Sequence, residues 1–248
     1  IVSGPNSGLS GTGTHYESTA AGGLVNFTTK RAGYTDITRL TLTHSGQGMG
    51  GAYFDLARRF GQNKDWGARL MVEKVEGETS VDGQKVKAAS IYINLDHEDA
   101  KSKTNFFTGY RQNEVVGGQR WFKLGGGVTR FPAVPKASRN YAFDGMDKSS
   151  YGWMMILNHE QKFSQDWKVF INAGYLKNNL NRNVMSEYSA ITILDDDGNF
   201  ALKSQTTGTP QRASYFQLGV SGKTRTGAAE HTLTLAADQA WRDLGGEF

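Results

Sequence analysis

The sequence predicts an all-β chain arranged largely as one antiparallel sheet, and three observations lead to this prediction. The 248 residues contain 31 glycines, 13 Phe, 10 Tyr and 5 Trp but only 4 prolines, a composition that favours strands and turns. Apolar and polar residues alternate with a period of two in many segments, as they do in strands with one apolar face. These segments recur along the chain, and their connections alternate between short and long.

Residues 1–23 are dominated by Gly, Ser, Thr and Ala and predict irregular backbone, followed by a short strand over 24–30. Nine longer strands are then expected. They cover 36–44, 52–60, 66–75, 86–97, 104–114, 151–162, 167–177, 214–223 and 231–241. Within 89–96, for example, Ala, Ile, Ile and Leu alternate with Ser, Tyr, Asn and Asp. One face of each strand is therefore expected to be apolar and the other polar.

The lengths of the connections separate two kinds of sheet. Short polar connections are expected at 61–65, 98–103, 163–166 and 224–230, and longer ones at 45–51, 76–85, 115–150 and 178–213. If successive strands are antiparallel, all short turns lie at one end of the sheet. A half-buried soluble sheet gives the same residue alternation, but the asymmetry of the connections is typical of an outer-membrane barrel. The sequence thus favours part of a transmembrane antiparallel β-barrel.

Composition excludes several functions. The chain has no cysteine and hence no disulfide, thiolate metal site or cysteine nucleophile. Its net charge of +4 comes from basic residues scattered among 24 acidic ones, which argues against nucleic acid as a partner. No apolar run approaches the roughly 20 residues of a membrane helix. Aromatic residues near strand ends are candidates for interfacial belts: Trp66, Tyr110, Trp167, Tyr175 and Trp241.

Motifs associated with catalysis fail on their context. The GxGxxG match at 46–51 precedes no helical pattern and predicts a hairpin connection, and SGKT at 221–224 lacks the first glycine of a P-loop. The DDDGN segment at 195–199 lacks EF-hand spacing and predicts a turn. His97-Glu98 and His159-Glu160 each lack the second histidine of HExxH. We therefore expect no enzyme, no catalytic or metal-binding residue and no cofactor.

Three segments resemble one known family. GPNSGLSG at 4–11 and AAGGLVNFTTKRA at 20–32 resemble the end of the plug in TonB-dependent siderophore receptors. GAYFDLARRFGQNKDWGARL at 51–70 is similar to the second and third barrel strands of that family with their periplasmic turn. TGAAEHTLTLAAD at 226–238 is similar to a mid-barrel turn and strand. The resemblance implies that residues 1–33 end a plug domain and that 34–248 supply about nine of 22 barrel strands.

The resemblance also implies a function and a location. It points to the outer membrane of a Gram-negative bacterium and to active uptake of a ferric siderophore or similar metal chelate. The expected partners are that chelate, TonB through a segment missing from this chain, and outer-membrane lipid and lipopolysaccharide. Nine strands would leave two unpaired edges in lipid, so we expect a piece of a longer polypeptide. The alternatives are a passive porin or adhesin barrel without TonB coupling and a soluble, sugar-binding β-sandwich.

Ligand-binding candidates follow from the same resemblance. In the ferrichrome type, a tyrosine follows the leucine of the retained plug loop, whereas this chain has Ser10 there, with His15 and Tyr16 further along the loop. The long external connections contribute a second group: Arg111, Arg120, Trp121, Arg130, Arg139 and Tyr141. Guanidinium groups and aromatic rings suit an anionic, aromatic siderophore. Ordinary solvated loops facing lipopolysaccharide explain the same residues.

Overall fold

The computed structural model describes residues 28–46, 48–118, 122–142, 147–183, 191–202 and 206–245. These residues form twelve strands and no helix, so none of them lies in a helix that could cross a membrane. The strands are β1 Ile37–Ser45, β2 Met49–Phe60, β3 Trp66–Glu78, β4 Lys85–Glu98, β5 Ser102–Val116, β6 Phe122–Gly127, β7 Lys148–Lys162, β8 Trp167–Asn183, β9 Ile191–Asp195, β10 Phe200–Leu202, β11 Thr206–Thr226 and β12 Ala229–Leu244.

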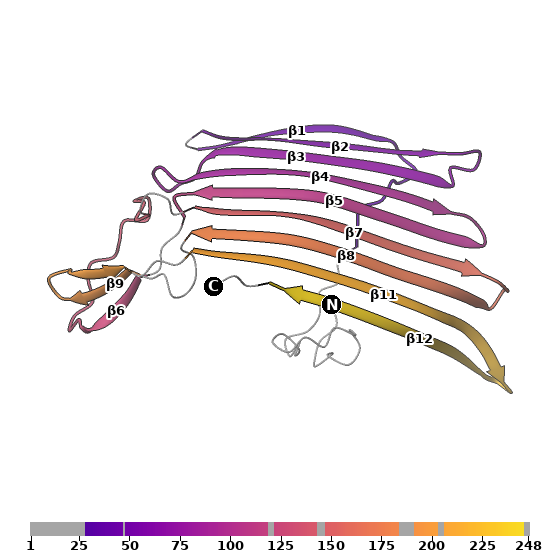
Figure 1. Cartoon of the computed structure of the whole chain (residues 1–248). Coiled ribbons are helices and arrows are strands. Elements are labelled where there is room, and N and C mark those ends of the chain that lie inside the picture. The colour runs from indigo at the N-terminus through magenta and orange to yellow at the C-terminus, as the bar shows by residue number, and fades with distance from the viewer. Residues whose placement is uncertain are drawn as a thin grey trace.

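Nine strands form one antiparallel sheet in the order β1-β2-β3-β4-β5-β7-β8-β11-β12 (Figure 1). The turns after β2, β4, β7 and β11 lie at one end of this sheet, here named the turn end. The connections that leave β5 and β8 lie at the opposite end, here named the loop end. The all-β prediction is therefore confirmed, with β1 and β12 as the two edges. The expected asymmetry of the connections holds for the two long ones, which leave β5 and β8.

The nine expected strands are all present, and most of them extend further than the sequence pattern indicates. Of the expected early strand over 24–30, residues 28–30 are irregular and the others lie outside the described residues. The connections expected to be long at 45–51 and 76–85 narrow to 46–48 and 79–84 because the flanking strands continue pairing. Gly48 adopts a φ of 81°, which confirms the GxGxxG segment as a hairpin connection.

Three strands were not expected. β6 and β9 pair in parallel and β9 pairs with β10 antiparallel, giving a small sheet beyond the loop end (Figure 1). These strands lie within the connections 115–150 and 178–213, which the sequence pattern described only as loops. They are short, and β6 includes three consecutive glycines, so propensity gives little signal there.

The two faces of the nine-stranded sheet are chemically inverted relative to a soluble protein. On the outer face Ile91, Ile93 and Leu95 of β4 are 41%, 37% and 43% exposed. On the inner face of the same strand Asn94 and Asp96 are buried, at 0% and 4%. Exposed apolar side chains beside buried polar ones suit a strand between lipid and a filled, polar lumen.

Aromatic side chains on the outer face form two bands. Near the turn end, Trp66 lies against Phe60 and against the His97 ring, with centroid distances of 6.5 and 4.5 Å. Toward the loop end, Tyr110 lies 4.8 Å from Trp153. Six residues separate the two registers along β4, or about 20 Å at the rise of a strand. This spacing is of the order of the apolar height of an outer-membrane barrel.

A continuous row of polar side chains crosses the inner face at one register. Each member is the direct cross-strand partner of the next, and the Nδ2 of Asn172 donates to the Oε1 of Gln217 at 2.9 Å. We call it the amide row. In strand order its members are Asp96, Asn105, Asn158, Asn172, Gln217 and Asp238.

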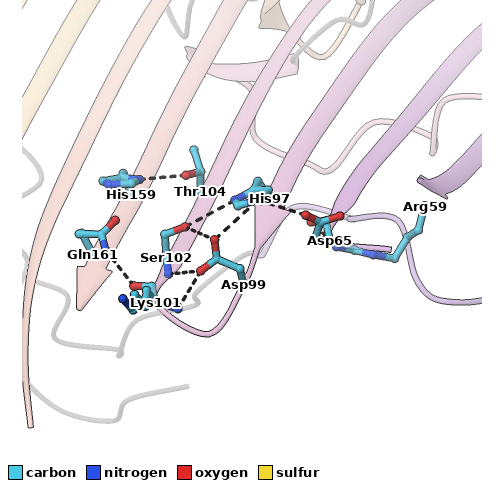
Figure 2. Close-up of polar contacts among 9 residues, drawn as sticks. All are labelled: Arg59, Asp65, His97, Asp99, Lys101, Ser102, Thr104, His159 and Gln161. Atoms are coloured by element: carbon cyan, nitrogen blue, oxygen red, sulfur yellow. Dashed lines mark hydrogen bonds and ion pairs between the residues drawn. The ribbon is translucent and has the colours of Figure 1, made fainter. Parts of the chain in front are cut away.

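The turns at the turn end are held by side chains (Figure 2). The Oδ1 of Asp99 accepts hydrogen bonds from the backbone amides of Lys101 and Ser102, both at 2.7 Å. These backbone donors hold the pKa of Asp99 below its ordinary value. His97 lies between carboxylates of two turns, with its Nε2 3.6 Å from Asp65 and 3.8 Å from Asp99. His159, of the other His-Glu pair, has its Nδ1 2.9 Å from the Thr104 hydroxyl, so both histidines take part in structural contacts.

Candidate functional site

The candidate ligand site lies at the loop end, where the small sheet meets the connection between β6 and β7 (Figure 1). The residues between β9 and β10 form its best-defined local element. The carboxylate of Asp195 accepts hydrogen bonds from the backbone amides of Asp197 and Asn199 and from the Asn199 side chain, at 3.1, 3.1 and 2.8 Å. Gly198 completes the turn with a φ of 85°. The DDDGN segment is therefore a turn, as predicted.

The next carboxylate, Asp196, fastens the turn to the β6–β7 connection. It accepts hydrogen bonds from the backbone amides of Thr129 at 2.9 Å and Arg130 at 3.2 Å, and from the Thr129 hydroxyl. The hydrogen bond from the Thr129 hydroxyl, followed by the one from the Thr129 backbone amide, lowers the pKa of Asp196 below its ordinary value. We call this contact the Asp196 clasp. The clasp joins Asp196 to Thr129 and Arg130, which lie 67 and 66 residues earlier in the chain, and so shapes the cavity between the two segments.

A cavity of about 680 Å³ lies between the small sheet and the β6–β7 connection, a size suited to a small-molecule ligand. Its apolar floor comes from all three strands of the small sheet, through Phe122, Ile193 and Phe200. Two guanidinium groups, of Arg130 and Arg139, line it as well. The cavity therefore combines apolar surface with two guanidinium groups, and the carboxylates of Asp195, Asp196 and Asp197 also line it.

Tyr141 links these features within the cavity wall. Its ring meets Phe122 edge-on, with centroids 5.2 Å apart, and the Arg139 Cζ lies 5.5 Å from the Tyr141 centroid. The acidic turn residues also line the cavity, but the carboxylates of Asp195 and Asp196 are occupied by the donors described above. The Arg139–Tyr141 pair offers a cation and an aromatic face side by side.

The structure brings together part of the predicted set. Arg130, Arg139 and Tyr141 share the cavity. The apolar floor went unpredicted because the pattern gave no sign that 122–127, 191–195 and 200–202 pair as a sheet. Five other candidates lie outside the described residues: Ser10, His15, Tyr16, Arg120 and Trp121.

Arg111 is not a loop residue. It lies within β5, on the inner face, with Ser90 and Gly152 as its cross-strand partners. It borders a hollow of about 200 Å³ at Gly109 and Gly152. The expectation that it belongs to an external loop is thus wrong, because Arg111 lies inside the strand expected over 104–114, which the structure contains as part of β5. Arg111 does not line the cavity of Arg139.

Comparison with known proteins supports a single class. No protein-family model matches the sequence. A curated relative, the ferrichrome receptor FcuA of Yersinia enterocolitica, is 29% identical over 157 residues, which are 63% of this chain and 21% of that protein. The ferric preacinetobactin receptor BauA from Acinetobacter baumannii matches with a TM-score of 0.80 at 24% identity, over 88% of this chain and 32% of that one.

A second solved structure extends the likeness. The ferripyoverdine receptor of the outer membrane of Pseudomonas aeruginosa, bound to ferripyoverdine, matches with a TM-score of 0.76 at 13% identity, over 92% of this chain and 30% of that one. These structural likenesses establish the fold. The chain spans only a part of each protein, 21% of the curated relative and 30–32% of the two solved receptors.

The antiparallel sheet, its apolar exposed face and its polar buried face define the wall of a transmembrane β-barrel. With the motifs of the sequence, these likenesses make the chain similar to a part of the TonB-dependent outer-membrane siderophore receptors.

Proposed function

We propose that this chain is part of an outer-membrane receptor that takes up a ferric siderophore or similar chelate with energy supplied through TonB. The observation that carries the proposal is the inverted sheet, in which Ile91 and Ile93 face outward while Asn94 and Asp96 are buried inside. A wall of this kind is stable only with lipid on one side and a polar filling on the other. The relatives' names supply the ligand class, since each is a receptor for an iron complex.

The sheet also requires more barrel than these strands. β1 and β12 are edges of the described sheet, and unpaired backbone groups in lipid each cost several kcal/mol. Further strands would join these edges and close the wall. We name the complete protein that carries this segment the parent receptor. Residues 1–33 are proposed to end its plug domain, and the following strands to begin its barrel.

The loop-end cavity is proposed as a contact site for the chelate. An anionic chelate with aromatic groups would place its negative charge near Arg130 and Arg139 and stack on Tyr141 or Phe122. The exposed apolar side chains of Phe122 and Phe200, 39% and 55% exposed, would lose water on binding. No covalent chemistry on the chelate is required.

Uptake by the parent receptor tests the proposal. The receptor would be produced in a strain that lacks its own siderophore receptors, and uptake of labelled ferric siderophores would be measured with and without a functional TonB. TonB-dependent accumulation supports the proposal. Uptake that is equal in both strains would instead establish a passive porin, and no uptake of any iron chelate would contradict the transport function.

The binding site is tested separately by the paired change Arg130→Gln and Arg139→Gln. Loss of two cations near an anionic ligand is expected to weaken binding about tenfold to a hundredfold, corresponding to roughly 1–3 kcal/mol. The matched control is Arg225→Gln, since Arg225 is exposed at the turn end. Equal Kd values for the double variant and the Arg225→Gln control would show that the cavity is not part of the binding site.

A further inference from the structure

The segment that leads into β1 is tied to the inner face of the sheet. Residues 28–36 form no strand, and the described trace crosses the sheet instead of pairing along it (Figure 1). Contacts with β2, β3 and β4 occur at five of the six positions from 29 to 34. The contacting pairs are Thr29 with Asn94, Lys30 with Tyr53, Arg31 with Arg69, Ala32 with Arg59, and Tyr34 with Arg59.

Arg69 provides the first main-chain contact. Its Nε and Nη2 donate to the two carboxylate oxygens of Asp55 at 2.9 and 2.6 Å, a bidentate pair. The remaining nitrogen, Nη1, donates to the backbone carbonyl of Arg31 at 2.9 Å. Both side chains are almost fully buried, at 12% for Arg69 and 3% for Asp55. Asp55, a residue of the sheet, thus holds the Arg69 guanidinium in place, and the remaining nitrogen is free to contact the segment.

Arg59 provides the second contact by the same plan. Its Nη1 donates to Asp96 Oδ2 at 2.8 Å and to the carbonyl of Ala32 at 3.0 Å. Its Nε and Nη2 donate to the carbonyls of Lys64 and Asp65 in the β2–β3 turn, at 2.6 and 3.1 Å. Tyr34 covers the guanidinium, with its centroid 5.3 Å from Cζ. One buried cation therefore joins the segment, a turn and β4.

These contacts share one chemical feature. Each arginine is neutralised by a carboxylate of the wall, Asp55 or Asp96, so the only hydrogen-bond acceptors that the segment offers the two arginines are backbone carbonyl oxygens. A planar guanidinium has five N–H donors in a fixed fork, and lysine cannot make the same set. The arrangement binds the backbone at two consecutive residues, whatever side chains those residues carry.

We propose that Arg59 and Arg69 are positioning residues that hold Thr29–Tyr34 on the barrel wall as a fixed anchor, so that movement of the preceding chain during transport stops there. The anchor itself stands on the contacts above, and its role in transport rests on the proposed function. The two arginines donate hydrogen bonds to two backbone carbonyls of the segment. Residues 28–36 form no strand, so no strand pairing holds the segment in place.

Distance measurements by pulsed electron spin resonance test the anchor in the parent receptor. This chain has no cysteine, so labels placed by Arg31→Cys in the segment and Asn63→Cys in the β2–β3 turn are unique within it. The Arg31 contact uses the backbone carbonyl, which the substitution keeps. A single narrow distance distribution is expected. It should remain unchanged when ferric siderophore and the TonB C-terminal domain are added, and a shift on their addition would overturn the anchor.

Paired substitutions test the arginines without leaving a buried charge alone. Arg69→Met with Asp55→Asn, combined with Arg59→Met and Asp96→Asn, is expected to widen the distance distribution at least twofold. Heat modifiability on a gel shows whether the barrel of this variant is folded. The more conservative variant Arg69→Lys keeps the charge, loses the fork and should widen the distribution too. A folded variant with an unchanged distribution would overturn the assignment.

Arg58→Met is the matched control. Arg58 lies next to Arg59 but donates to Ile37 and Thr38 of β1 and to its own strand. It pairs with Asp36 at 3.5 Å, after the anchored stretch, and makes no hydrogen bond or ion pair with the described residues Thr29–Tyr34. Its loss should leave the distance distribution unchanged, and equal widening would overturn the specific role of Arg59 and Arg69. TonB-dependent uptake should fall at least fivefold in the paired variant with ligand Kd within twofold. Absence of uptake in the unsubstituted receptor would refute the proposed function, while the distances decide the anchor independently.

Discussion

The side-chain Nδ2 of Asn158 on β7 donates a hydrogen bond to the side-chain Oδ1 of Asn172 on β8 at 2.8 Å, and the two residues are direct cross-strand partners. The Nδ2 of Asn172 in turn donates a hydrogen bond to the Oε1 of Gln217 at 2.9 Å. One central amide therefore serves as acceptor on one side and donor on the other. The amide row gives the inner wall a polar surface whose groups satisfy one another from Asn158 to Gln217, whereas Asp96 Oδ1 and Asn105 Oδ1 accept no hydrogen bond from the described residues.

The change Asn172→Ala is predicted to destabilise the barrel by about 1–2 kcal/mol, because it leaves the donor of Asn158 and the acceptor of Gln217 without partners. The free energy of unfolding would be measured in urea with the parent receptor in lipid vesicles. Asn113→Ala is the control, since Asn113 makes no side-chain hydrogen bond with the described residues. A control loss as large as that of Asn172→Ala would contradict a role for the row.

Gly67 on β3 is predicted to tolerate no side chain. A Cβ there would lie 2.4 Å from Asp96 Oδ1, and that carboxylate is held by Arg59. Gly67→Ala should therefore cost about 1–3 kcal/mol through overpacking. Gly174→Ala is the matched control, because the nearest atom to its Cβ would be the Met155 carbonyl oxygen at 3.9 Å. Equal urea midpoints for the two variants would show that Asp96 moves freely.

The face assignment predicts opposite effects for two neighbouring residues of β12. Leu235 is 74% exposed on the apolar outer face, and Ala236 points to the inner face. In lipid, Leu235→Lys should destabilise by up to about 2–4 kcal/mol, as a lysine does near the middle of the bilayer. Ala236→Lys should cost less than about 1 kcal/mol in the same urea titration, since lumen positions tolerate charge. The reverse order would mean that the faces are exchanged.

The Asp196 clasp is predicted to open in acid. Its hydrogen bonds lower the pKa of Asp196, so the clasp contributes stability above the ordinary aspartate pKa of about 4 and loses it as pH falls through the lower folded value. Hydrogen exchange at the Thr129 and Arg130 amides, corrected for intrinsic rates, should show protection at pH 6 that is lost as the pH falls below the lowered pKa of Asp196. Asp196→Asn should abolish this difference, and protection that persists in acid would refute it.

The period-two pattern was enough to predict the nine-stranded sheet, because each strand has one apolar face and one polar face. Lengths were underestimated where polar ends such as 178–183 continue pairing, since hydrogen bonding of the backbone needs no apolar side chain. The turn at 195–199 was predictable because Asp, Gly and Asn encode it locally.

By itself, the sequence determined the sheet, the apolar and polar face of each strand and the family resemblance, since these depend on local alternation and on motifs contiguous in the chain. The tertiary structure alone decided which distant residues meet. Arg139 and Tyr141 reach the floor of β6, β9 and β10 only through a parallel pairing of segments about seventy residues apart. In the sequence, Arg59 and Arg69 do not differ from other basic residues of a strand. Their hydrogen bonds to the carbonyls of Ala32 and Arg31 form only because the segment before β1 crosses the sheet.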